Sequence, residues 1–250
     1  MNLIGHMTCA ERFSGEAQLG AMLPDLLSLY DRRIRPMKIV RAHATGSNGG
    51  EAGLQRGMRF HFYVDSHFHR SSLFRDGCAV IRDRLIAASA TPGLKRFAVA
   101  HILTELFLDH LLIVDTPERL AAFYDVLRRG EASVLEMTAL PDTQVDWADF
   151  ADFLTRLISG RFADGYLEME SLFHRMDRIL PRLRQRTLER RERDALAEGL
   201  AAHADRARKQ LALFVRTMQT WDGSAEIPAR PPSGDTGAPD VDASGPAGIE

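Results

Sequence analysis

The sequence is poor in cysteine, with only Cys9 and Cys78 among its 250 residues. Two cysteines cannot form a disulfide framework, and their separation is not that of a metal site. We expect both to be reduced, largely buried side chains. The N-terminal residues MNLIGHM have neither the basic stretch nor the long apolar run of a signal peptide. No stretch approaches the roughly 20 apolar residues of a membrane helix, so we expect a cytoplasmic protein with no membrane partner.

The sequence also lacks the signs of a β-sheet. No segment alternates with period two for long enough to predict one, and there is no internal repeat. Ala, Leu, Arg and Glu, which favour helices, dominate the segments that look structured. Because 45% of the residues are hydrophobic, the chain has ample material for a core. The prediction is an all-α protein with a single compact multi-helix domain over residues 1–221.

Breaks rich in glycine and proline divide this domain into helical segments. Pro24 falls inside the first segment and predicts a kink or restart there. Thr116 and Pro117 read as an N-cap followed by proline in the first turn. We expect helices over about 15–32, 51–69, 71–88, 94–113, 117–129, 132–137, 145–159, 162–180 and 181–218.

The last segment, 222–250, has almost no large apolar residue. It carries six acidic residues and one arginine, a net charge of −5, whereas the whole chain has a formal charge of −2. Such a composition cannot bury enough surface to offset its ordering entropy, so we predict a disordered acidic tail. The remaining residues then carry only about +3, which makes a nucleic-acid partner unlikely by charge.

Histidine is abundant, with nine residues, and two groups are placed where chemistry is plausible. His61, Asp65 and His69 recur every four residues, so they share one face of a helix. Asp109 and His110 interrupt a strongly apolar helix, where a carboxylate is costly unless it is paired or bound to a metal. The alternatives are a solvated helix face for the first group and the polar edge of a core helix for the second.

Several short blocks add a family resemblance. Residues 1–6 read MNLIGH, and SG at 14–15 is followed by LGAMLPD at 19–25; residues 57–69 read GMRFHFYVDSHFH, and 105–112 read ELFLDHLL. In order and spacing these blocks resemble the acyl carrier protein phosphodiesterase family. That family has an MNFLAH-type start and then the patterns S-x-x-G-N-L-x-x-D, G-I-x-x-H-R-x-I-D-x-x-T-D and D-x-x-x-D-H-F-L.

The resemblance implies a fold like that of the HD-domain phosphohydrolases. It also implies hydrolysis of the phosphodiester that joins 4′-phosphopantetheine to a serine of holo-acyl carrier protein. The implied cofactor is a divalent metal, typically manganese, with iron or zinc as alternatives. Such an ion polarises a phosphoryl oxygen and activates water, and imidazoles and carboxylates suit it. The implied ligands are His6, Asp25, His61, Asp65 and Asp109, and the implied catalytic residues are Asp25, Asp65 and His110.

The sequence departs from the family pattern at several of these positions. Phe62 replaces an arginine that would clamp phosphate, and Ala21 replaces the asparagine of the G-N-L segment. Phe68 and His69 replace the Thr-Asp pair, and Glu105 replaces an aspartate. His69 is therefore a further metal ligand candidate, with a changed preference among metals. A nucleotide or another small phosphate ester is the alternative substrate.

An arginine series marks the C-terminal helices. If one helix continues through Pro181, the spacing aligns Arg175, Arg178, Arg182 and Arg186 in a stripe. A basic face attracts an acidic partner, and acyl carrier proteins are acidic. The stripe has no interleaved aromatic residues, which argues against stacking on single-stranded nucleic acid. A solvated helix face and a non-catalytic protein that binds an acidic partner are the alternatives.

Overall fold

Helices make up all the regular structure in the described part of the chain. The structure is a computed structural model, and it describes residues 1–44, 53–89, 91–136 and 145–223. The elements are α1 (Leu3–Cys9), α2 (Gly15–Tyr30), α3 (Pro36–Ala44), α4 (Gly53–Phe68), α5 (Ser72–Ala88), α6 (Arg96–Asp115), α7 (Glu118–Glu136), α8 (Trp147–Ser159), the 3₁₀ helix η2 (Phe162–Tyr166), α9 (Met169–Ile179), the 3₁₀ helix η3 (Leu180–Leu183) and α10 (Arg190–Met218). The predicted all-α class is confirmed. The predicted tail lies almost wholly outside the described residues.

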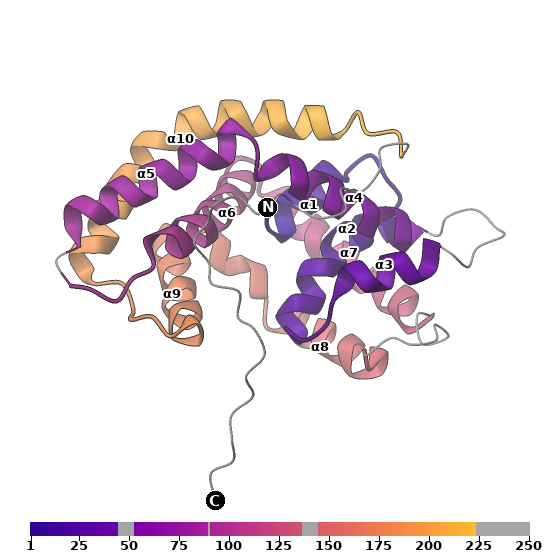
Figure 1. Cartoon of the computed structure of the whole chain (residues 1–250). Helices are drawn as coiled ribbons and strands as arrows, with labels where there is room; N and C mark the ends of the chain where they lie inside the picture. The colour runs from indigo at the N-terminus through magenta and orange to yellow at the C-terminus, as the bar shows by residue number, and fades with distance from the viewer. Residues whose placement is uncertain (45–52, 90, 137–144, 224–250) are drawn as a thin grey trace, which may run out of the picture.

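Helix α6 forms the centre of the fold. It packs against α1, α5, α7, α9 and α10, and the N-terminus lies close to it in the middle of the molecule (Figure 1). By length and composition α6 could cross a membrane, because its most apolar window has a mean hydropathy of 1.8, but 61% of that window is buried in the molecule. The expectation that no segment has this composition was therefore wrong. Its burial is that of a core helix.

Two glycines bring α2 and α4 into close contact. A Cβ atom on Gly20 would lie 2.2 Å from the backbone oxygen of Leu54, and one on Gly57 would lie 2.1 Å from the backbone oxygen of Ala17. Neither contact is sterically allowed, so the two helices cross at this distance only because both positions lack a side chain. The crossing sets the distance between Asp25 on α2 and His61 on α4.

Helices α5 and α10 lie side by side along one edge of the molecule (Figure 1). A capping box starts α10: Glu189 and Glu192 each accept a hydrogen bond from the other's backbone N–H. Arg186 donates to the buried carboxylate of Glu192 at 2.6 and 2.7 Å. After α10, Trp221 is 3% exposed and packs on Phe60 at 5.2 Å between ring centroids. Among the described residues, Trp221 is the last side chain that is buried in the core.

The C-terminal helices differ most from the prediction. The expected helix 181–218 begins only at Arg190, because η3 and a left-handed Arg184 (φ 55°) separate α9 from α10. The expected helix 162–180 is likewise divided into η2 and α9. A left-handed Arg161 (φ 47°) comes directly before η2. The short helices α1 and α3 were not predicted. Pro24 is accommodated inside α2, which runs on to Tyr30.

Candidate metal centre

Helix α1 places His6 in the interior, with its side chain fully buried. The start of this helix is held by α6, because the Asp109 carboxylate accepts hydrogen bonds from the backbone N–H groups of Ile4 (3.1 Å) and Gly5 (2.8 Å). Burial raises the pKa of Asp109 to about 7. Burial also holds the pKa of His6 well below its ordinary value, with the nearby His61 adding to the effect, so the imidazole is neutral.

Helix α4 contributes His61, which is 4% exposed. Its Nδ1 lies 2.9 Å from the backbone oxygen of Ala21 on α2. A carbonyl oxygen only accepts, so Nδ1 carries the proton. Burial lowers the pKa of His61 to about 4. The neutral ring therefore presents an unprotonated Nε2 on its other side.

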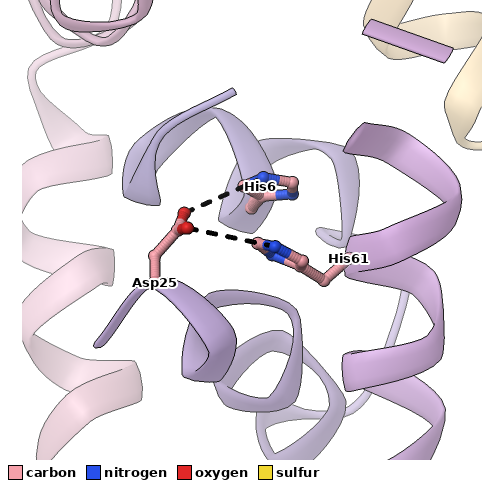
Figure 2. Close-up of side chains that lie close together, drawn as sticks. All are labelled: His6, Asp25 and His61. Atoms are coloured by element: carbon pink, nitrogen blue, oxygen red, sulfur yellow. Dashed lines mark ion pairs between the residues drawn. The ribbon is translucent and has the colours of Figure 1, made fainter. Parts of the chain in front are cut away.

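Asp25, on α2, faces both rings (Figure 2). Its Oδ2 is 3.9 Å from His6 Nε2, and its Oδ1 is 3.9 Å from His61 Nε2. The two rings are stacked, with centroids 3.9 Å apart and planes 25° apart. We call His6, Asp25 and His61 the inner cluster; one ligand atom from each lies within 4.8 Å of the others.

The inner cluster contains buried polar atoms that no described residue satisfies. His6 Nε2 and Asp25 Oδ2 are both buried without a hydrogen-bond partner in the described part of the chain. A separation of 3.9 Å is too long for a hydrogen bond, but a cation with bonds of about 2.0–2.2 Å can span it. Burial raises the pKa of Asp25 well above its ordinary value, and Asp65, Glu105 and Asp109 raise it further. This donor set fits a divalent cation, which would satisfy the orphaned atoms.

Asp65 lies next to the inner cluster, one helical turn after His61. Its Oδ1 is 3.9 Å from His6 Nε2 and accepts a hydrogen bond from the amino group of Met1 at 3.0 Å. Burial acts to raise the pKa of Asp65, but the Met1 ammonium, His69 and His61 outweigh it and the pKa is lowered. Its side chain is 33% exposed, so this ionised carboxylate can meet both solvent and the cluster.

His69 does not join the inner cluster. It lies beyond Asp65, with its Nδ1 3.6 Å from Asp65 Oδ2. Its Nε2 faces His101 and Glu105 from α6, and we call His69, His101 and Glu105 the outer cluster. His101 was not among the site residues predicted from the sequence. The missed signal was its spacing of four residues from Glu105, which places both on one face of α6.

Asp109 and His110 are not among the residues whose ligand atoms converge in the inner cluster. Both oxygens of Asp109 are engaged by the backbone of α1, so this residue positions His6. His110 turns toward η2, where its Nδ1 donates a hydrogen bond to the backbone oxygen of Tyr166 at 2.7 Å. Neither residue is in the inner cluster where the resemblance puts it.

The four predicted partner-binding arginines have different surroundings. Arg175 is buried, with its guanidinium 4.1 Å from the centre of the Phe162 ring and 4.3 Å from that of Tyr166. Arg186 is held by Glu192. Arg178 and Arg182 are exposed. Because η3 interrupts the helix, the four do not form one continuous stripe.

A basic hollow nevertheless lies beside α9. It has a volume of about 360 Å³, and its lining includes Arg156, Arg161, Arg175, Arg178 and His174. No residue of the inner or outer cluster lines it. Two of the four predicted arginines, Arg175 and Arg178, therefore line this hollow together with Arg156 and Arg161.

Searches of protein-family models, curated proteins and solved structures found no match to this chain. Function is therefore inferred from the geometry of the site and from the residues that carry the family resemblance.

Proposed function

We propose that the protein is a metal-dependent phosphodiesterase that removes 4′-phosphopantetheine from holo-acyl carrier protein. One observation carries the proposal: two neutral imidazoles and a carboxylate converge in the interior with unsatisfied atoms facing one another. Neutral imidazole nitrogens and a carboxylate repel each other at close range unless a proton or a cation lies between them. Manganese, or alternatively iron or zinc, suits this mixed nitrogen and oxygen donor set.

His6, Asp25 and His61 would hold the ion. When bound, the ion supplies electrostatic stabilisation to the phosphoryl oxygens and lowers the pKa of water. The protein orients the metal ligands even without the ion. The backbone oxygen of Ala21 fixes the ring of His61, and Asp109 fixes the start of the helix that carries His6. Groups that hydrogen-bond to the ligands without touching the metal hold those ligands in the geometry that catalysis needs.

Asp65 is the proposed general base. It is ionised, one-third exposed, and 3.9 Å from Nε2 of His6. It would take the proton of a water as the water oxygen bonds to phosphorus and the bond between phosphorus and the carrier serine oxygen breaks. The serine alkoxide would then take up the proton that Asp65 accepted, which regenerates the carboxylate. The placement of His110 against Tyr166 leaves it without a role in this step.

The proposed substrate rests on the family resemblance and on charge. The basic hollow offers the exposed Arg178 together with Arg156 to an acidic carrier protein. Exposed charges at an interface act mainly on the association rate. Substitution of both arginines by glutamate should therefore raise KM more than it lowers kcat.

A small phosphate ester is the second candidate substrate, and Phe62 favours it. This partly buried ring packs edge-to-face on His61 with centroids 5.2 Å apart. An apolar ring therefore lies where the family has a phosphate-binding arginine, and a diester on a carrier protein would lose that contact.

Hydrolysis assays with Mn²⁺ separate these proposals. We expect release of 4′-phosphopantetheine from holo-acyl carrier protein by the wild type, and loss of this activity in Asp25→Asn and Asp65→Asn. The matched control is His67→Gln, since His67 is an exposed histidine of α4. Activity on nucleotides or small esters with none on holo-carrier protein would favour the second candidate. Activity on neither would favour a non-catalytic protein that binds an acidic partner.

A further inference from the structure

The outer cluster has the dimensions of a zinc site. His69 Nε2 is 3.2 Å from His101 Nε2 and 3.5 Å from Glu105 Oε1, and His101 Nε2 is 3.3 Å from the same Glu105 oxygen. Ligand atoms about 2.0–2.1 Å from a tetrahedral zinc ion lie about 3.3 Å from each other. The three atoms therefore already form one face of a zinc tetrahedron.

The hydrogen bond at one ring nitrogen of His69 directs the other ring nitrogen at His101 and Glu105. Nδ1 lies 2.9 Å from the backbone oxygen of Asp65, to which it donates its proton. In the neutral ring, Nε2 is then an unprotonated acceptor directed at His101 and Glu105. Histidine ligands of metals are commonly oriented in this way, with the other ring nitrogen donating to a carbonyl or carboxylate.

Phe74 holds both rings from one side. Its ring centroid lies 4.8 Å from that of His69 and 5.0 Å from that of His101, edge-to-face in both cases. The cluster is also open to solvent, because the side chains of His69 and His101 are 26% and 41% exposed. A metal can therefore enter without unfolding of the protein.

Glu105 brings an ionised carboxylate to the outer cluster. Glu105 shares the amino group of Met1 with Asp65, each at 3.0 Å. Burial acts to raise the pKa of Glu105, but the ammonium and the two histidines hold it well below its ordinary value. A carboxylate oxygen has two lone pairs, so Glu105 Oε1 can accept from Met1 and still bind an ion.

We infer that His69, His101 and Glu105 form a second divalent-metal site, selective for zinc-like tetrahedral ions and separate from the inner cluster. Three protein ligands and an open fourth position are typical of a zinc site that binds water or a substrate oxygen. Two of the three residues, His69 and Glu105, are positions where the sequence departs from the family pattern. The inference concerns metal binding and does not depend on the proposed reaction.

The test is a titration of the metal-free, untagged protein with Co²⁺ and Zn²⁺, read by visible absorption and by calorimetry. Tetrahedral Co²⁺ has a strong visible band, and Zn²⁺ should displace it. His101→Gln and His69→Gln should abolish the band and weaken this site by more than the roughly 100-fold seen for outer-sphere changes. Asp25→Asn should retain the band. His67→Gln is the matched control, because its Nδ1 also hydrogen-bonds a backbone oxygen one turn earlier, that of Tyr63 at 2.8 Å.

A band that is absent in the wild type, or that is as strong in the double variant Asp25→Asn, His101→Gln as in Asp25→Asn alone, would overturn the inference and leave the outer cluster as a hydrogen-bonded network. Because His101 is partly exposed, its substitution should leave the fold intact, which circular dichroism checks. Cobalt binding in the outer cluster without any hydrolase activity would refute the proposed function but not this site.

Discussion

Single residues divide into those that face the inner cluster and those that hold others in place. Asp109 belongs to the second group. Its two carboxylate oxygens accept hydrogen bonds from the backbone N–H groups of Ile4 and Gly5. These are two of the donors that the start of a helix normally leaves to solvent or to a cap. Asp109 therefore contributes to the site by positioning His6.

Asp109→Asn separates positioning from ligation. An amide has one acceptor oxygen, so one backbone N–H would face an NH₂ group and lose its partner. We expect a loss of about 1–3 kcal/mol in the free energy of unfolding and about 10–100-fold weaker Mn²⁺ binding. Urea denaturation and calorimetry measure the two effects. Unchanged stability together with complete loss of metal would instead make Asp109 a direct ligand.

At the scale of helices, the site depends on how closely α2 and α4 approach. Gly20 and Gly57 permit contacts of backbone against backbone that no other residue allows. Asp25 and His61 come from these two helices, and His61 is hydrogen-bonded to the backbone of α2. The helix crossing and the site geometry are therefore coupled.

Gly57→Ala should separate α2 from α4. Because the added methyl group would lie 2.1 Å from a backbone oxygen, we expect a destabilisation of about 1–3 kcal/mol from overpacking, together with weaker metal binding. Gly15→Ala is the control, since a Cβ there meets nothing within 4 Å. Equal stability of the two variants in thermal unfolding would show that the helices tolerate a wider crossing.

The sequence predicted the long helices better than the short ones and better than the contacts between them. Helices α4 and α5 follow from an apolar face, and α6 follows from a long apolar run after Pro92 and Gly93. The seven-residue α1 is too short for such a pattern, and its start depends on Asp109, 105 residues away from Ile4 in the chain.

Site residues were predictable where a local pattern or a family motif marked them. His6, Asp25 and His61 were named from motifs and do come together. His101 was not named, because its partner His69 lies on another helix and periodicity says nothing about which faces meet. Arg175 was predicted to lie on a partner surface, but its guanidinium is buried against Phe162 and Tyr166. The sequence did not reveal this burial because it depends on the turn at η2.

On the scale of the whole molecule, Trp221 is the last described side chain that packs into the core. Its indole packs against Phe60 and Tyr63 of α4, with ring centroids 5.2 and 5.8 Å away. A chain that ends at residue 223 should therefore unfold at the same temperature as the full chain. Trp221→Ala should lower the free energy of unfolding by about 3–5 kcal/mol. A melting temperature several degrees lower for the shortened chain would place the domain boundary further along the sequence.

The central claim is that the inner cluster binds a divalent metal, and metal analysis of the purified protein beside Asp25→Asn tests it most directly. The outer cluster is removed from the comparison by using His101→Gln as the background for both samples. After loading with Mn²⁺ and removal of excess ion, we expect about one equivalent in the background protein, with Asp25→Asn retaining almost none while keeping its helical circular dichroism. Absence of metal from both samples, or equal metal in both, would contradict the claim.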